Sequence, residues 1–185
     1  QAAEGSGDLL FPGSDFNDWS AFTGALSTHG LKDYATESTT GGRGGSGALH
    51  IKGTPSGNDY VFTAVVPAGF SAEGKTMIHF WVKGTAAKSL SMNVYIGPGN
   101  DMGTDYKTYN MDEFAIYNSH QVLEPKDSNS YTKGTIDTSG EWIQVTLDIS
   151  SIAGQINTTA GQNLFALKVG KTAAYDLLFD DIMIE

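Results

Sequence analysis

The sequence predicts an all-β fold, a two-sheet antiparallel β-sandwich of the jelly-roll kind. Short runs in which apolar and polar residues alternate recur along the chain, as expected of strands with one buried face. No stretch longer than about ten residues has a convincing helical period. The 185 residues include 23 glycines and are only 17% charged, a composition rich in turns. Many strands without crossover helices favour a sandwich or a barrel over an α/β fold.

The first four strands are expected between residues 48 and 97. The run ALHIK (48–52) follows a glycine-rich segment, and DYVFTAVV (59–66) is rich in β-branched and aromatic residues. Alternation is most regular in TMIHFWVKG (76–84) and SLSMNVYIG (89–97). Gly, Pro, Asn and Ser separate these runs, which is typical of turns between antiparallel strands.

The other strands are expected in the second half of the chain. They are EFAIYNS (113–119), EWIQVTLDI (141–149), LFALKVG (164–170) and DLLFDDIMIE (176–185), with SYTKGTID (130–137) as a ninth candidate. Clusters of Gly, Pro, Asn and Ser again separate the runs, so the sequence predicts at least eight strands.

Three segments do not fit a strand pattern. Residues 1–7 are small and polar and predict a flexible linker, which leaves 8–185 as one domain. Gly154 interrupts SSIAGQINTTA (150–160), so a loop with one helical turn is expected there. The connection from Gly97 to Glu113 is longer than a hairpin needs, which indicates either a functional loop or a solvated insertion.

The net charge and the composition limit the classes of partner that the chain is expected to bind. With 21 acidic and 11 basic residues the formal charge is −10, and no Lys or Arg cluster is present, so nucleic acid is excluded as a partner. We expect uncharged or positively charged partners. The chain has no cysteine and no apolar segment near the ~20 residues that span a bilayer. Its polar start resembles what remains after a leader is removed, which indicates a secreted or cell-surface protein whose leader is absent from this chain.

Alternation also assigns faces to the two most regular strands. The core-facing residues are expected to be Ile78, Phe80, Val82, Met92, Val94 and Ile96. If the strands pair through a short turn at 84–88, His79, Trp81, Asn93 and Tyr95 form a polar and aromatic patch on the outer face, with Tyr117 beside it.

Five segments together resemble a known family, in the right order. They are FPGSDFNDWS (11–20), GSGALHI (45–51), IHFWVKG (78–84), GEWIQVTLDISSI (140–152) and LLFDDIMIE (177–185). The chain is similar in these segments to carbohydrate-binding modules with the galactose-binding-domain-like jelly-roll fold. The resemblance implies a bacterial, non-catalytic, glycan-binding module.

The resemblance also implies a structural Ca²⁺ that ties the first strand to the last. The matching positions are Asp15, Asn17, Glu37, the carbonyls near 39–42, and Asp180, a set of oxygen ligands such as calcium prefers. Asn17 stands where the family usually has Glu, which implies a weaker site. The alternative is that Asp180 accepts hydrogen bonds from backbone N–H groups or a lysine. Strand alternation places Asp181 on the opposite face, in water.

Sugar rings stack on aromatic side chains, and their hydroxyls pair with amides, carboxylates or histidine. The ligand-binding candidates are therefore His79, Trp81, Asn93, Tyr95 and Tyr117, with Tyr106 and Tyr109 from the 97–113 connection. A packing role is the alternative for each of them. It weighs most for Trp81 and for Trp142, because family members commonly have a packing Trp at both positions.

No familiar catalytic motif is present. The four histidines lie far apart in the sequence, and neither an H-E-x-x-H pair nor a G-x-S-x-G turn occurs. The sequence thus favours a module that binds a polysaccharide or oligosaccharide near a glycoside hydrolase or glycan-uptake partner. The alternative is a structural or protein-interaction domain such as an adhesin segment. A small glycoside-cleaving enzyme is the least favoured class.

Overall fold

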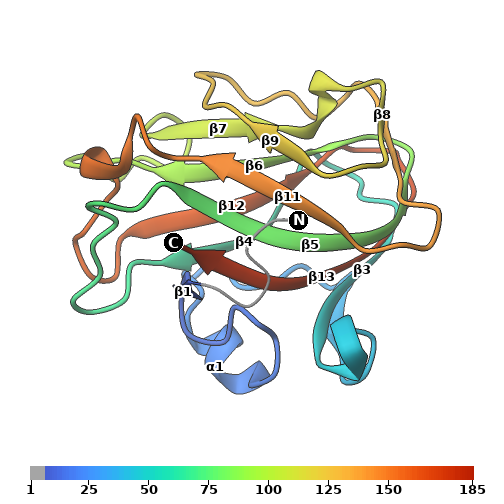
Figure 1. Ribbon diagram of the computed structural model, residues 1–185, viewed down its shortest axis with the longest axis horizontal. Helices are drawn as coiled ribbons and strands as arrows, with labels where there is room; N and C mark the ends of the chain where they lie inside the picture. Colours follow the sequence, from blue (N-terminus) through green and yellow to red (C-terminus); the bar gives the residue numbers. More distant parts are fainter. Residues whose placement is uncertain (1–6) are drawn as a thin grey trace.

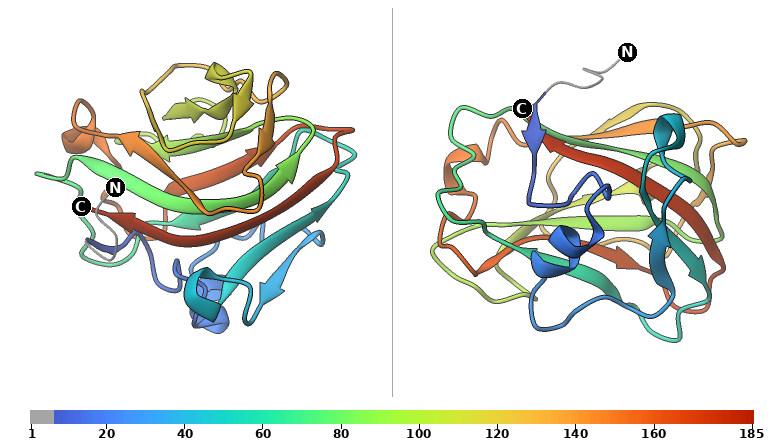
Figure 2. Two further views of the ribbon diagram at one scale, coloured as in Figure 1. Left: turned by 45° about the vertical axis from the view of Figure 1, so that its right-hand side comes forward. Right: turned by 90° about the horizontal axis from the view of Figure 1, so that it is seen from below.

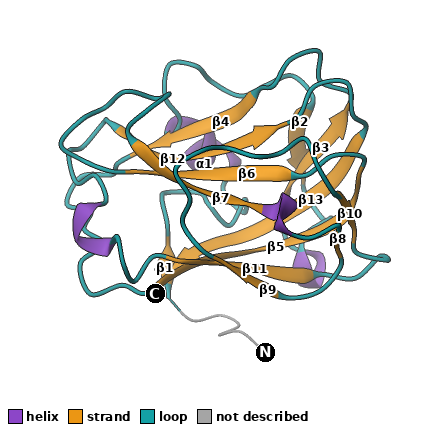
Figure 3. Ribbon diagram, turned by 90° about the horizontal axis from the view of Figure 1, so that it is seen from above, coloured by secondary structure: helices purple, strands orange, loops and turns teal. Residues whose placement is uncertain are grey.

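The computed structural model describes residues 7–185, which form two β-sheets packed face to face (Figure 1). The predicted two-sheet antiparallel β-sandwich is confirmed. Apart from Gly7, the predicted linker at 1–7 lies outside the described residues. Figure 3 shows that helices contribute only short segments, which are α1 (Trp19–Gly24) and the 3₁₀ turns η1 (Arg43–Gly45), η2 (Met111–Glu113) and η3 (Ala153–Gln155).

The larger sheet has nine strands. They are β1 (Asp8–Leu9), β2 (Ala35–Ser38), β3 (Ala48–Gly53), β5 (Met77–Ala86), β8 (Ile116–Tyr117), β9 (Gln121–Leu123), β10 (Thr135–Asp137), β11 (Ile143–Asp148) and β13 (Tyr175–Ile184). The long strands β5 and β13 pair antiparallel at its centre, and β3 flanks β13 (Figure 1). Two short pairs, β8 with β10 and β9 with β11, are parallel.

The smaller sheet has four strands in the order β4-β12-β6-β7, all antiparallel. Their bounds are β4 (Tyr60–Val65), β6 (Leu90–Tyr95), β7 (Tyr106–Asn110) and β12 (Asn163–Val169). No helix among residues 7–185 is long and apolar enough to cross a membrane.

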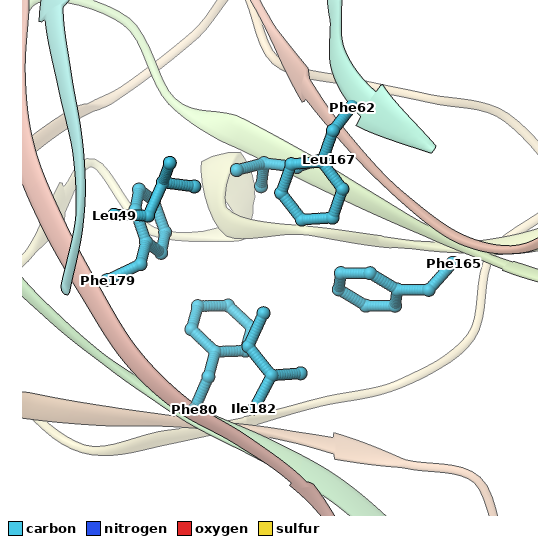
Figure 4. Close-up of a pocket in the computed structure, with 7 residues that line it drawn as sticks. All are labelled: Leu49, Phe62, Phe80, Phe165, Leu167, Phe179 and Ile182. Atoms are coloured by element: carbon cyan, nitrogen blue, oxygen red, sulfur yellow. The ribbon is translucent and has the colours of Figure 1, made fainter. Parts of the chain in front are cut away.

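The core lies between the two sheets. Figure 4 shows seven of its side chains facing one another, and they leave no room for a water molecule: Leu49, Phe62, Phe80, Phe165, Leu167, Phe179 and Ile182. Leu49, Phe80, Phe179 and Ile182 come from the large sheet, and the other three come from the small one. Close packing of this kind supplies most of the free energy that stabilises a sandwich.

The predicted period-two runs all contain strands, although EFAIYNS (113–119) forms only the two-residue β8, and several short strands follow no apolar pattern. β2 reads ATES and lies outside the predicted runs, and β7 reads YKTYN within the connection expected at 97–113. The 97–113 connection is thus shorter than predicted, because β7 and η2 occupy its second half. The segment at 150–160 contains a single 3₁₀ turn, as expected.

The expected pairing of the runs at 76–84 and 89–97 is wrong. β5 lies in the large sheet and β6 in the small sheet, so the short segment between them crosses from one sheet to the other. Ala87 N–H donates to Ala174 O at 2.9 Å, and the Tyr175 hydroxyl donates to Ser89 O at 2.6 Å. The C-terminal strand thereby holds the crossing, which from sequence alone looks like a hairpin.

The last strand lies beside the opening segment of the chain, as the family resemblance implies. We call this junction the seam. β1 pairs with the end of β13, with Asp8 opposite Ile184 (Figure 2). Farther along, the Ser14 hydroxyl donates to Ile182 O at 2.7 Å, and Ile182 N–H donates to Ser14 O at 3.0 Å. These contacts close one edge of the sandwich.

Candidate functional site

The outer face of the small sheet carries a group of tyrosines that we call the tyrosine face. It consists of Tyr60 on β4, Tyr95 on β6, Tyr106 on β7, Lys168 on β12 and Tyr131 from the loop that follows β9. Neighbouring strands bring them together, since Tyr60 pairs with Lys168 and Tyr95 with Tyr106 in the sheet register. Tyr95 is buried, while the other four are half-buried.

The floor of the tyrosine face is a hydrogen-bonded amide network. Asn129 Nδ2 donates to Asn93 Oδ1 and to Thr108 Oγ1, each at 2.7 Å. Asn93 Nδ2 in turn donates to the Tyr95 hydroxyl at 3.3 Å. Such buried polar groups are tolerated because each has a partner, and the network fixes the rings that stand on it.

Met102 covers one end of the tyrosine face. Its carbonyl accepts hydrogen bonds from the hydroxyls of Tyr60 at 3.0 Å and Tyr95 at 2.9 Å. On its other side Met102 lines an open groove of about 490 Å³ whose polar walls include His29, Asn100 and Asn163.

Lys168 stands between two of the rings. Its Nζ lies 4.4 Å from the Tyr60 ring centroid and 5.2 Å from that of Tyr131, both cation–π distances. Nζ also donates to Asn129 Oδ1 at 3.4 Å. The Tyr95 and Tyr106 rings meet edge to face at 5.9 Å. These contacts hold the exposed ring edges in fixed positions.

Burial sets the protonation of the tyrosine face. It raises the pKa of Tyr60, Tyr106 and Tyr131 and, most of all, of Tyr95, and it lowers the pKa of Lys168. The phenols are therefore neutral at pH 7. A neutral phenol can both donate and accept a hydrogen bond, which suits the hydroxyls of a sugar.

The second notable site is the seam at Asp180. This side chain is fully buried although it points away from the core, because the loop before β3 folds over it. Asp180 Oδ2 accepts from Arg43 N–H at 2.8 Å and from the Ser46 hydroxyl at 3.0 Å, and Oδ1 accepts from Asp181 N–H at 2.8 Å. Burial raises the pKa of Asp180 to about 7, with repulsion from Asp181 adding to it, while the Arg43 and Ser46 hydrogen bonds oppose the rise.

Two glycines allow the loop to approach Asp180 this closely. A Cβ on Gly42 would lie 2.3 Å from Gly47 O and 2.7 Å from Asp180 Oδ2, and a Cβ on Gly47 would lie 2.1 Å from Phe16 O. Gly42 and Gly47, in the glycine-rich segment 41–47, thus let the loop fold over the carboxylate.

Arg43 closes the seam from outside. Its guanidinium lies 3.9 Å over the Trp81 ring, and its Nη1 pairs with Asp181 Oδ2 at 3.2 Å. Asp181 adopts a positive φ of 51° where the pairing of β13 with β5 shifts register, which marks a β-bulge. The bulge explains how two adjacent carboxylates fit into an apolar strand, since Asp180 turns under the loop and Asp181 meets Arg43.

The calcium candidates do not converge on Asp180 as side chains. Asn17 Oδ1 accepts from Gly47 N–H at 2.9 Å, Asp15 Oδ1 accepts from Asn17 N–H, and Glu37 is exposed on the edge strand β2. Among residues 7–185, no three Asp, Glu or His side chains form a group that could hold a metal ion. N–H and O–H donors surround Asp180, which matches the alternative drawn from the sequence. A calcium ion there would have to displace them, so calcium binding stays a prediction.

The polar and aromatic patch expected across β5 and β6 is not formed. His79 and Trp81 lie on the outer face of the large sheet and Asn93 and Tyr95 on that of the small sheet, and all four are at most 4% exposed. His79 is enclosed by Glu185 at 3.0 Å and Gln144 at 3.1 Å. Elements added over each sheet bury these residues, which alternation alone cannot reveal.

The remaining ligand candidates are separated too. Tyr117 is buried on β8 in the large sheet, so it does not neighbour Asn93 or Tyr95 as expected. Tyr109 belongs to the core, and its hydroxyl donates to Asp148 O at 2.7 Å. Of the seven candidates, the structure brings Asn93, Tyr95 and Tyr106 together at the tyrosine face.

Sequence analysis missed the other members of this face. Tyr60 and Lys168 sit in predicted strands, and Tyr131 opens the weak run at 130–137. The pairing of β4 with β12 contains a register shift between Leu167 and Lys168, which disturbs the alternation that assigns faces. The number of tyrosines in the sequence is the one signal for this face, and it does not show where they gather in the fold.

No family model and no curated protein matches this chain. A solved structure with some similarity is the cleaved adhesin domain of Lys-gingipain from Porphyromonas gingivalis, with 16% identity and a TM-score of 0.39. The alignment covers 79% of this chain and 78% of that one. A likeness at this level transfers no function.

Proposed function

We propose that this chain is a non-catalytic glycan-binding domain that works outside the cytoplasm and binds its ligand on the tyrosine face. The observation that supports this proposal is the set of half-buried rings of Tyr60, Tyr106 and Tyr131 above a floor of amides. Pyranose rings stack their C–H faces on such aromatic surfaces, and fixed amides and phenols select their hydroxyls.

The groups that form the tyrosine face also fit binding better than cleavage. They are phenols, amides and one ammonium group, whereas glycoside hydrolysis usually requires two carboxyl groups roughly 5 to 9.5 Å apart. Preformed hydrogen bonds hold the rings before any ligand arrives, so little conformational entropy is lost on binding. Such a domain would keep a polysaccharide close to a glycoside hydrolase or a glycan-uptake protein.

A protein-interaction or adhesin domain is the second candidate. Ile116 on β8 and Val122 on β9 are 56% and 58% exposed, on short strands that pair with β10 and β11 of the large sheet. Exposed apolar side chains at a sheet edge suit a protein partner. Among the described residues, Leu9 is the one other large apolar side chain that is exposed, so we rank this candidate below glycan binding.

A glycan array followed by titration calorimetry tests the proposal. We expect at least one polysaccharide or oligosaccharide to bind at millimolar concentration or below. Tyr131→Ala should weaken that binding by about fivefold or more, because stacked rings contribute on the order of 1 kcal/mol or more. Trp142→Ala is the matched control, since Trp142 is also half-buried but contacts Lys83 of the large sheet. Absence of any bound glycan would overturn the proposal.

A further inference from the structure

We propose that the tyrosine face selects glycans that carry an anionic substituent, and that the Lys168 ammonium group pairs with it. This inference rests on the proposed function and specifies its ligand class. It departs from the uncharged or positively charged partners that the net charge of −10 favours, because the local surroundings of Lys168 differ from the average surface. It starts from the surroundings of Lys168, which combine two aromatic rings with a neutral amide.

Lys168 differs from the cationic side chains that form ion pairs among the described residues. Arg43, Lys75, Lys107 and Lys126 each lie within 4 Å of a carboxylate oxygen. No such pair forms at Lys168 within residues 7–185, although the chain has ten more acidic than basic residues. Other lysines also lack a carboxylate partner, but among the described residues Lys168 is the one whose ammonium group lies over two aromatic rings.

The half-buried position of Lys168 makes its charged ammonium group costly for the folded protein. Lys168 is half-buried on β12, an inner strand of the small sheet, so water solvates its ammonium group only in part. The rings of Tyr60 and Tyr131 compensate some of the lost hydration but bring no negative charge. An anion supplied by a ligand would complete the site, and a charge-assisted hydrogen bond in a half-buried setting is strong.

The geometry fits an acidic sugar in particular. The ammonium group lies over the rings of Tyr60, at 4.4 Å, and Tyr131, at 5.2 Å, which are two of the three rings proposed to contact a sugar. An anionic substituent on a sugar bound at these rings would therefore lie close to the ammonium group. Asn129, which accepts from Nζ, holds the group in place. Uronate carboxylates and sulfate esters share the required chemistry.

Matched pairs of acidic and neutral polymers test the inference and distinguish a uronate carboxylate from a sulfate ester. Calorimetry would compare polygalacturonate with its methyl ester, and dextran sulfate with dextran, so that each pair differs only in the anionic group. We expect one acidic polymer to bind about tenfold or more tightly than its neutral partner, as a charge-assisted hydrogen bond implies. The preference should also shrink at high salt.

Two variants assign the preference to Lys168. Lys168→Met keeps the length of the side chain and should abolish the preference while weaker neutral binding persists. Lys83→Met is the control, because Lys83 also stands over an aromatic ring, that of Trp142, but in the large sheet. Equal binding of acidic and neutral polymers, or a preference that survives Lys168→Met, would overturn the inference and leave glycan binding intact. Failure of every polymer, in this test and on the array, would instead remove the proposed function.

Discussion

The backbone N–H of Arg43 donates a hydrogen bond of 2.8 Å to Asp180 Oδ2, which joins the loop before β3 to the last strand. This contact and the adjoining bulge explain the two carboxylates inside the apolar run LLFDDIMIE. A buried carboxylate survives in a folded protein only with such donors, because its desolvation is otherwise too costly. Several measurable properties depend on this seam.

Stability should depend on pH through Asp180. Its folded-state pKa of about 7 lies above the roughly 3.9 of an unfolded aspartate, so the folded state binds the proton more tightly. The free energy of unfolding should therefore fall by about 2 kcal/mol between pH 5 and pH 8 on account of this group. Asp180→Asn should remove that part of the decline. Urea unfolding of both proteins at the two pH values measures it, and parallel pH profiles would contradict the prediction.

Calcium can be tested at the same carboxylate. If Asp180 is the ligand that the family resemblance implies, millimolar calcium should raise the melting temperature relative to a chelator, because the ion binds only the folded state. The shift should vanish in Asp180→Asn and persist in Asp176→Asn, whose carboxylate is exposed on the same strand. An unchanged melting temperature in the wild-type chain would leave Asp180 as a purely hydrogen-bonded carboxylate.

Gly42→Ala tests how closely the loop encloses Asp180. The backbone of Gly42 has an ordinary φ of −76°, so the new methyl group acts through its clashes with Gly47 O, Ser46 Oγ and Asp180 Oδ2. We expect a loss of about 1–3 kcal/mol in the free energy of unfolding, typical of overpacking. Gly154→Ala is the control, since no atom lies within 4 Å of its added Cβ. Similar unfolding curves for both variants would refute the tight enclosure.

Alternation in the sequence located the core residues well. Ile78, Phe80 and Val82 face inward as predicted, because a half-buried strand repeats its environment every two residues. The same signal cannot say which sheet a strand joins, since pairing partners are distant in sequence. The three residues between β5 and β6 fit either a hairpin or a crossing. The contacts of Tyr175 and Ala174 with this segment decide for a crossing.

The sequence pattern also does not reveal that residues pointing away from the core are buried. His79 and Trp81 point away from the core, yet neighbouring elements cover them, among them the loop that carries Arg43 and the segment that carries His120. The contact between the opening segment and the last strand was expected from the resemblance of 11–20 and 177–185 to a family's opening and closing motifs, and the structure has it, although no family model matches the chain. The tyrosine face was not, because its members come from four strands and one loop whose arrangement only the fold supplies.

Trp81→Ala should be a stability variant and not a binding variant. The ring is 4% exposed, with the Arg43 guanidinium 3.9 Å above it and the His120 ring edge-on at 5.7 Å. Truncation should cost about 3–5 kcal/mol in the free energy of unfolding. Any variant protein that remains folded should bind glycan normally, because the tyrosine face lies on the other sheet. Chemical unfolding and calorimetry measure the two effects, and weakened binding with full stability would place the ligand on the large sheet.

Backbone amide chemical shifts of the chain with a bound glycan show directly whether the glycan lies on the tyrosine face. Titration of the labelled chain with its best array ligand should shift the amides around Tyr60, Tyr106, Asn129, Tyr131 and Lys168, while those of β2 and β3 stay in place. Shifts confined to the large sheet, or to its exposed edge at Ile116 and Val122, would contradict the account.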